Sequence, residues 1–217
     1  MSPSSHGPLG IFGGTFDPVH IGHLRAALEV VETLGFQKVI LVPAGIPPHK
    51  RRPDITSFYH RYEMLKLSVQ GEPKLEVSDI EGKRKGPSYT VETLGIIGRE
   101  SLDTFFILGS EAFLEIHTWK EFERLFSITS FVILLRDPGH MDAIRDYLSG
   151  LKIAFSQESK TEWTLYSQKK VVFLRPTSIQ ISGSLVRRLR REGKSIRYLV
   201  PDKVNEYVIA NGLYIAP

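Results

Sequence analysis

The stretch Leu9–Leu24, which reads LGIFGGTFDPVHIGHL, decides the fold. Its first four residues form a short apolar run that stops at Gly13-Gly14, as a buried strand does where it enters a tight loop. From His23 onward, apolar residues recur at the i, i+3, i+4 and i+7 positions of one helix face, and Gly35 is a suitable end for that helix. The stretch therefore predicts a strand, a loop with two histidines, and a helix.

Apolar runs and helical patterns then alternate along the chain. A strand predicted at Val39–Val42 completes a strand–helix–strand unit, whose crossover is right-handed in nearly all proteins. Further strands are expected over residues 75–77, 104–108, 131–135 and 171–174, and further helices over residues 58–69, 90–99, 141–148, 184–192 and 201–210. This alternation predicts an α/β fold with a doubly wound, mostly parallel sheet and helices on both faces. Because no linker or repeat divides the pattern, we expect a single domain over residues 1–217.

The composition limits the class of protein. A hydrophobic content of 41% and a charged content of 24% are ordinary for a globular chain. There is no cysteine, which excludes disulfides, thiolate metal sites and cysteine nucleophiles. Residues 1–7 lack the pattern of a signal peptide, and no apolar run approaches the roughly 20 residues that cross a bilayer. We therefore expect a cytoplasmic protein without a membrane partner.

The loop between the first predicted strand and helix is the place where open parallel sheets bind ligands. It lacks the GxGxxG fingerprint, so a redox enzyme that uses NAD has little support. His20 and His23 are three residues apart and project from the same face near the helix N-terminus, where free N–H groups favour phosphate. Two imidazoles there can hydrogen-bond phosphate oxygens as charge builds during phosphoryl transfer.

Two other interpretations of this histidine pair are open. They could be ordinary surface or core histidines, or they could be two ligands of a zinc ion. The zinc interpretation is weak because the sequence offers no nearby third and fourth ligands and no cysteine. The position of the loop and its glycines favour a phosphate site.

The segment G-G-T-F-D-P-V-H-x-G-H-L resembles the HxGH signature of the nucleotidyltransferase superfamily, and its longer form is similar to bacterial nicotinate-nucleotide adenylyltransferases. The resemblance extends along nearly the whole chain and implies a Rossmann-like nucleotidyltransferase fold. It implies that His20, His23 and Arg187 are the catalytic residues and that no covalent enzyme intermediate forms. The residues that it assigns to ATP are Gly13, Gly14, Thr15, Phe16, His20, His23, Gly109, Ser182, Ser184 and Arg187.

Further motifs of the same family match the chain in order. The run Pro47-Pro48-His49-Lys50 resembles the P-P-H-K loop, and residues 87–94 resemble P-S-Y-T-x-x-T-L. Ser88 or Thr90 is also expected to cap the helix that follows. The resemblance implies that a mononucleotide is held by His49, Lys50, Ser88, Tyr89, Thr90, Glu111 and Trp119. A flat indole can stack on a pyridine ring.

Two positions depart from the family pattern, and both bear on the site. Glu111 stands where the family usually has the aspartate of G-x-D, and Gly183 replaces a serine of I-S-S-T-x-I-R. The resemblance implies that the C-terminal helical part, about residues 182–217, completes the ATP site. Ser184 is a good helix start, and Arg187, on the same face, can form a fork over the phosphate tail.

The implied reaction joins ATP and nicotinate mononucleotide to give the dinucleotide and pyrophosphate, a step of NAD biosynthesis. Mg²⁺ is expected to arrive with ATP, and no protein metal site is expected. Other acceptors stay open, namely nicotinamide mononucleotide, phosphopantetheine or a cytidylyl acceptor. So does a non-catalytic nucleotide sensor. Nucleic-acid binding by the basic residues 187–197 has little support because aromatic residues are not interleaved with them. The oligomeric state is open.

Overall fold

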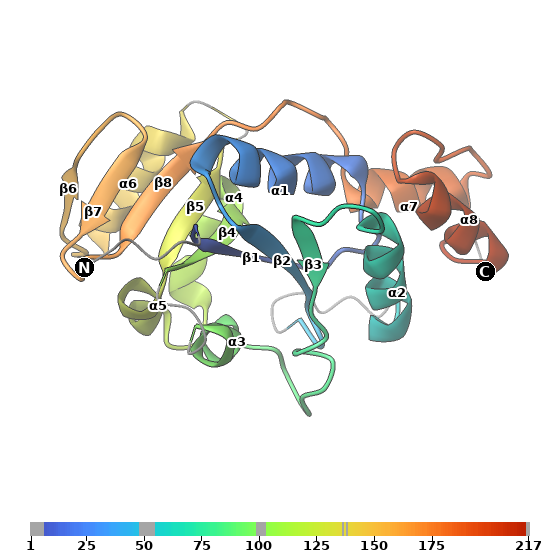
Figure 1. The fold of residues 1–217 in the computed structure, drawn as a ribbon, viewed down its shortest axis with the longest axis horizontal. Helices are drawn as coiled ribbons and strands as arrows, with labels where there is room; N and C mark the ends of the chain where they lie inside the picture. Colours follow the sequence, from blue (N-terminus) through green and yellow to red (C-terminus); the bar gives the residue numbers. More distant parts are fainter. Residues whose placement is uncertain (1–6, 48–54, 99–102, 136, 138, 216–217) are drawn as a thin grey trace.

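The computed structural model describes residues 7–47, 55–98, 103–135, 137 and 139–215. In this part of the chain, eight strands form one sheet in the order β3-β2-β1-β4-β5-β8-β7-β6 (Figure 1). Their bounds are β1 (Leu9–Gly14), β2 (Lys38–Pro43), β3 (Leu75–Val77), β4 (Thr104–Gly109), β5 (Ser130–Leu134), β6 (Phe155–Gln157), β7 (Glu162–Leu165) and β8 (Lys170–Leu174). The strands from β3 to β8 in this order are parallel, and β7 is antiparallel to both β8 and β6.

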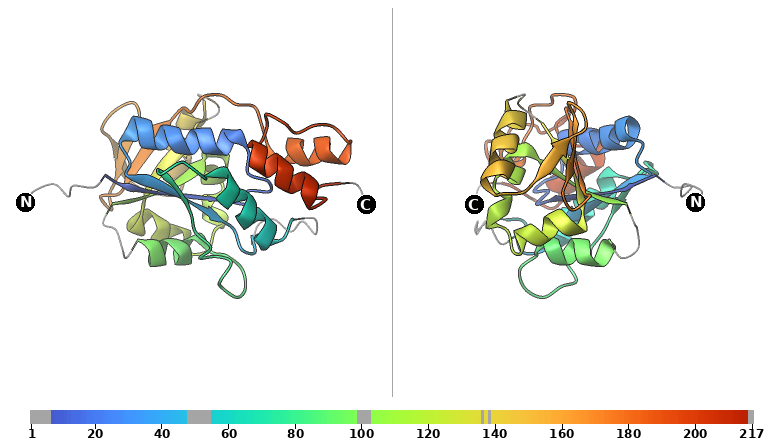
Figure 2. Two further views of the ribbon diagram at one scale, coloured as in Figure 1. Left: turned by 45° about the vertical axis from the view of Figure 1, so that its right-hand side comes forward. Right: turned by 90° about the vertical axis from the view of Figure 1, so that its left-hand side faces the viewer.

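Helices cover both faces of the sheet. They are α1 (Ile21–Leu34), α2 (Phe58–Ser68), α3 (Thr90–Ile97), α4 (Ser110–Leu114), α5 (Phe122–Ile128), α6 (His140–Gly150), α7 (Gly183–Arg191), α8 (Asp202–Ala210) and the short 3₁₀ helix η1 (Ile116–Thr118). Figure 1 shows α1 along one side of the sheet, and α3 and α5 on the opposite side. Figure 2 shows the same layers from two further directions.

Each face has its own apolar core. Buried residues of α1, α2, α7 and α8 pack with one set of strand residues, among them Phe12, Leu41 and Ile107. Buried residues of α3, α4, α5 and α6 pack with the alternate set, among them Ile11 and Phe106. Because successive side chains of a strand point to opposite faces, the central strands are apolar on both sides. This explains why they were continuous apolar runs in the sequence.

The order of the strands places a crevice at the end of β1. From β1 the chain moves outward to β2 and β3, and it then returns to place β4 on the other side of β1. In open α/β sheets, ligands bind outside the carboxyl ends of the strands at such a switch point. The loop that follows β1 and Gly109 at the end of β4 both lie at this edge.

The doubly wound, mostly parallel fold predicted from the sequence is confirmed, with element ends shifted by one or two residues. The prediction omitted α4, α5 and the antiparallel strands β6 and β7. These are short elements of three to seven residues, too short for a clear period. Of the helices that the structure describes, none combines the length and the apolar character that crossing a membrane requires.

Candidate active site

The two histidines lie at the start of α1, in the loop of residues 13–23 that we call the histidine loop. His20 has extended backbone and immediately precedes the helix, and His23 is in its first turn. The backbone N–H of His20 donates to Nδ1 of His23 at 3.3 Å. The two imidazole rings stack with centroids 3.6 Å apart and an interplanar angle of 23°. The structure therefore brings together the pair that the sequence placed on one face.

Two aromatic rings, those of Phe16 and Phe106, pack against residues of the histidine loop. Phe16 is buried and its ring meets that of His23 edge-on, with centroids 5.0 Å apart. A Cβ added at Gly13 would lie 2.9 Å from the ring of Phe106, and one at Gly14 would lie 3.0 Å from the ring of Phe16. A side chain at either position would therefore crowd an aromatic ring of the core, a reason for glycine that the sequence did not indicate.

Asp17 connects the histidine loop to the C-terminal part of the chain. The residue is only 4% exposed, and Oδ1 accepts a hydrogen bond from the Tyr214 hydroxyl at 2.8 Å. Arg187, also buried, donates through Nη1 to the main-chain oxygen of Asp17, and the same nitrogen lies 3.7 Å from Oδ2. A buried arginine beside a buried carboxylate keeps its charge balanced. Tyr214 and Arg187 are thus held against the loop that carries the histidines.

The start of α7 lies against the same loop. The helix begins at Gly183, and the side chain of Ser182 caps it by accepting from the N–H of Leu185 at 3.1 Å. The sequence-based start at Ser184 was therefore one residue late. Ser184 instead accepts a hydrogen bond from Nη2 of Arg187 at 3.3 Å. A Cβ added at Gly183 would lie 2.8 Å from the carbonyl oxygen of Asp17, so this close approach accounts for glycine in place of serine.

A cavity of about 290 Å³ lies beside the histidine loop. Residues from several separate segments line it, including Gly13 and Gly14 at the end of β1, Thr15 after it, Ser88 and Tyr89 before α3, Thr90 at its start, Gly109 at the end of β4, and Trp119 after η1. Trp119 meets the ring of Phe106 edge-on, with centroids 6.1 Å apart. The structure thus brings most of the residues expected at the mononucleotide site to one cavity.

Ser88 has a different local role from the one predicted. Its hydroxyl oxygen accepts hydrogen bonds from the N–H groups of Gly45 at 3.0 Å and Ile46 at 3.2 Å. The residue before α3 is Tyr89, and no side chain caps this helix. The prediction that Ser88 or Thr90 caps α3 was therefore wrong, because the Ser88 hydroxyl binds the backbone of the loop after β2 instead.

Two further residues of this region, Glu81 and Lys120, were missed in the sequence, and Thr93 was matched to a motif without being assigned to the site. Glu81 is buried, accepts from the N–H of Gly45 at 3.3 Å and accepts from the Thr93 hydroxyl at 2.6 Å. Nζ of Lys120 lies 4.4 Å from the centre of the Tyr89 ring. Glu81, Thr93 and Lys120 line the cavity. Thr93 is the second threonine of the P-S-Y-T-x-x-T-L motif, whereas no motif or spacing distinguished Glu81 and Lys120 from surface polar residues.

Three of the residues predicted for the mononucleotide site, Glu111, His49 and Lys50, are not among the cavity residues that the structure describes. Glu111 is exposed in the first turn of α4 and is not among the residues that line the cavity. His49 and Lys50 lie outside the described residues. Among the residues that the structure does describe, no group of three or more histidine, cysteine, aspartate or glutamate side chains is arranged to hold a metal ion.

A parallel α/β sheet with a histidine pair at its switch point is the arrangement expected of a nucleotidyltransferase. The model of the cytidylyltransferase-like family matches residues 11–189, and the chain belongs to this family. Within it, the chain belongs with the nicotinate-nucleotide adenylyltransferases. A relative from Desulfatibacillum aliphaticivorans named "probable nicotinate-nucleotide adenylyltransferase" is 43% identical over 95% of this chain and 99% of its own length. One of the same name from Geotalea daltonii is 39% identical over 95% and 97%.

Solved structures agree on the fold. A Plasmodium falciparum nicotinic acid mononucleotide adenylyltransferase complexed with NaAD superposes with a TM-score of 0.73 at 20% identity, over 96% of this chain and 98% of that one. A structure from Vibrio parahaemolyticus named "putative nicotinate-nucleotide adenylyltransferase" superposes with a TM-score of 0.62 at 17% identity, over 97% of each chain. At such identities the likeness concerns the fold alone.

Proposed function

We propose that this chain transfers the adenylyl group of MgATP to nicotinate mononucleotide and releases pyrophosphate, a step of NAD biosynthesis. The observation that carries this proposal is the stacked pair His20 and His23 at the N-terminus of α1, beside a cavity lined by Thr15, Tyr89 and Trp119. The names of the relatives at about 40% identity support nicotinate mononucleotide as the acceptor.

The reaction needs positioning more than proton transfer. An oxygen of the mononucleotide 5′-phosphate attacks the α-phosphorus of ATP, and the bond from that phosphorus to the oxygen bridging to the β-phosphate breaks. That oxygen leaves with the electron pair as part of pyrophosphate. Because the attacking phosphate is already an anion, no general base is required. In this proposal His20 and His23 donate hydrogen bonds to the α- and β-phosphates, and the N-terminus of α1 adds favourable charge.

The ATP side of the site joins two distant parts of the chain. We assign to it Gly13, Gly14, Thr15 and Phe16 of the histidine loop, together with Gly109, Ser182, Ser184 and Arg187. The contacts of Arg187 and Tyr214 with Asp17 support a role for residues 182–217 in completing this site within a single domain. Arg187 would bring positive charge to the β- and γ-phosphates.

The acceptor side follows from the cavity. Tyr89 and Thr90 open α3, whose first N–H groups suit the carboxylate of nicotinate, and Trp119 suits its pyridine ring. Ser88 would contribute indirectly, because its hydroxyl oxygen holds the loop at Gly45 that borders the cavity. We keep Glu111, His49 and Lys50 as further acceptor residues on the strength of the family motif.

Magnesium belongs to the substrate in this proposal. Asp17, the acidic residue of the histidine loop, directs its carboxylate to Tyr214 and Arg187. This fits an ion that is carried by the triphosphate and keeps most of its water. The composition, without cysteine, supports a cytoplasmic setting.

The test is pyrophosphate release from MgATP with either nicotinate or nicotinamide mononucleotide as acceptor. We expect strong release with nicotinate and weaker release with nicotinamide. Pyrophosphate release with nicotinamide mononucleotide alone would support adenylyl transfer but would show that the proposed acceptor is wrong. ATP binding without release in the presence of either acceptor would contradict catalysis and favour a nucleotide sensor.

A further inference from the structure

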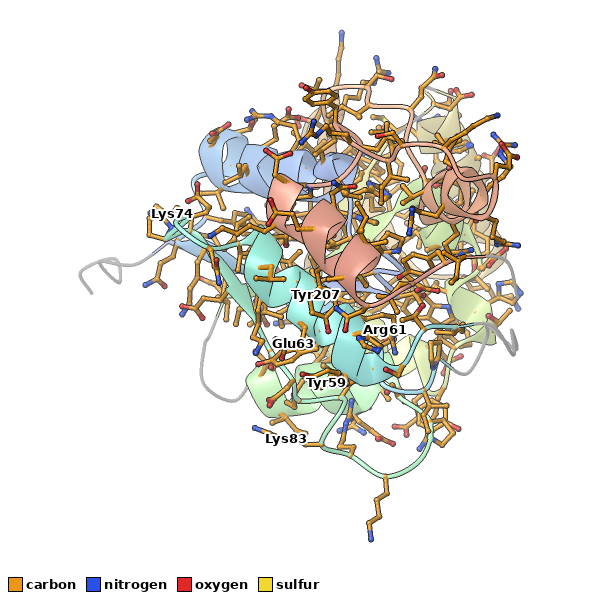
Figure 3. All side chains as sticks on the ribbon, turned by 90° about the vertical axis from the view of Figure 1, so that its right-hand side faces the viewer. Tyr59, Arg61, Glu63, Lys74, Lys83 and Tyr207 are labelled. Atoms are coloured by element: carbon orange, nitrogen blue, oxygen red, sulfur yellow. The ribbon has the colours of Figure 1, made fainter. Side chains whose placement is uncertain are left out.

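One buried arginine, Arg61, lies outside the motifs matched in the sequence and contacts both the histidine loop and the loop after β2. Arg61 is in the first turn of α2, on the side of the molecule where α2 meets α8 (Figure 3), and it is 1% exposed. Each of its three guanidinium nitrogens donates to a different backbone carbonyl. Nε binds the oxygen of Thr56 at 2.8 Å, Nη1 that of Thr15 at 2.8 Å, and Nη2 that of Gly45 at 3.1 Å.

These carbonyl groups belong to segments that are far apart in the sequence. Thr15 is in the histidine loop, Gly45 follows β2, and Thr56 precedes α2. The same Gly45 donates its N–H to Ser88 at 3.0 Å and to Glu81 at 3.3 Å. A continuous series of hydrogen bonds therefore runs from the histidine loop through the guanidinium group to the wall of the cavity.

The chemistry of the guanidinium group explains why arginine is needed here. Its donors have a fixed planar arrangement, whereas the lysine ammonium group is compact and cannot reach three acceptors spread around a plane. Burial lowers the pKa of Arg61, and the nearby charge of Asp17 counteracts this effect. If the side chain were removed, three carbonyl groups would lose their donor in a buried site.

We propose that Arg61 is a positioning residue. Through its hydrogen bonds to Thr15 and Gly45, it fixes the position of the histidine loop relative to the cavity residues that bind the acceptor. It does not touch substrate. The inference rests on the proposed function, since it concerns how the two substrate phosphates are aligned. Misplacement of a reacting group by about 1 Å is enough to reduce a rate about a hundredfold.

The test is the steady-state kinetics of Arg61→Lys, with rates expressed per folded molecule. We expect kcat to fall by about tenfold to a hundredfold, with a smaller change in KM for either substrate, because alignment in the transition state is lost. Arg124→Lys, at an exposed position of α5, is the matched control and should keep the wild-type kcat. If the lysine variant does not fold, Arg61→Gln takes its place, since it keeps two polar atoms in a smaller side chain.

A double-mutant cycle separates positioning from stability. Ser88 binds the N–H of Gly45, and Arg61 binds its carbonyl oxygen. The effects of Ser88→Ala and Arg61→Lys on kcat should therefore be non-additive, and the double variant should be less impaired than the product of the two single losses. Wild-type kcat in a folded Arg61 variant, or losses that multiply, would overturn the inference. Absence of pyrophosphate release by the wild-type protein would instead refute the proposed function.

Discussion

The hydroxyl group of Tyr214 donates to Oδ1 of Asp17 at 2.8 Å, although the two residues are 197 positions apart. Burial and the charge of Asp17 raise the pKa of Tyr214, so that its hydroxyl keeps the proton and remains a donor. Because Asp17 also contacts Arg187, the histidine loop, α7 and the last described residues form one connected group. In the proposed function, the ATP side of the site would therefore depend on these contacts between the histidine loop and the C-terminal part of the described chain.

Tyr214→Phe tests this connection. The change removes a hydrogen bond to a buried carboxylate, and such bonds are worth about 1.5–3 kcal/mol. We expect a lower free energy of unfolding in urea and a higher KM for ATP. Tyr198→Phe, at a side chain that is 78% exposed, is the control and should change neither. Wild-type stability and KM in the Tyr214 variant would show that the contact has no such role.

Gly183→Ala tests the close approach of α7 to the histidine loop. The added Cβ would lie 2.8 Å from a backbone oxygen of Asp17, so the helix start has to shift away. We expect KM for ATP to rise and the melting temperature to fall. Gly95→Ala is the matched control, because its Cβ meets nothing within 4 Å and alanine favours a helix interior. Equal behaviour of the two variants would argue against the steric account.

Glu29 is expected to give stability that depends on pH. Although burial alone would raise the pKa of this carboxyl group, hydrogen bonds from Thr177 and Arg25 lower it below the ordinary value of 4.5. The contribution is therefore complete above the unfolded-state pKa and is lost as the pH falls through the lower folded-state pKa.

The measurement is the free energy of unfolding of wild type and Glu29→Gln as a function of pH. We expect the wild-type protein to be more stable at neutral pH and the difference to shrink from about pH 5 downward. The hydrogen bond from the hydroxyl of Thr177 ties α1 to the segment between β8 and α7. A difference that is constant across this pH range would contradict the assignment.

Trp119→Ala tests the acceptor cavity. Stacking of a base on an aromatic ring is worth about 1–3 kcal/mol, so we expect KM for nicotinate mononucleotide to rise about fivefold or more. KM for ATP should change much less. Tyr166→Ala, at an exposed aromatic residue, is the control. An equal rise in both KM values would place the effect outside the acceptor side.

The sequence was sufficient to predict the parallel part of the sheet and the histidine loop, but not the short antiparallel strands β6 and β7. Strands buried on both faces are continuous apolar runs, and the histidine pair is a local motif at a strand end. Arg61 was missed because a charged residue on a helix is usually solvated, and only the fold brings it to three carbonyl groups. The contact of Tyr214 with Asp17 is non-local, and one sequence carries no signal for such pairs. The sequence allows the hydroxyl of Ser88 to bind either an N–H of the helix that follows or an N–H far away in the chain. In the fold it binds the distant N–H of Gly45.

The most direct test of the central claim is formation of nicotinate adenine dinucleotide from MgATP and nicotinate mononucleotide, by wild type and by folded His20→Ala. We predict rapid formation by the wild type and a rate about 10²–10³-fold lower in the variant, because one donor that stabilises developing charge is lost. Dinucleotide formation at the wild-type rate by the variant would contradict the role of the histidine pair. Failure of the wild type to form the dinucleotide would contradict the proposed reaction itself.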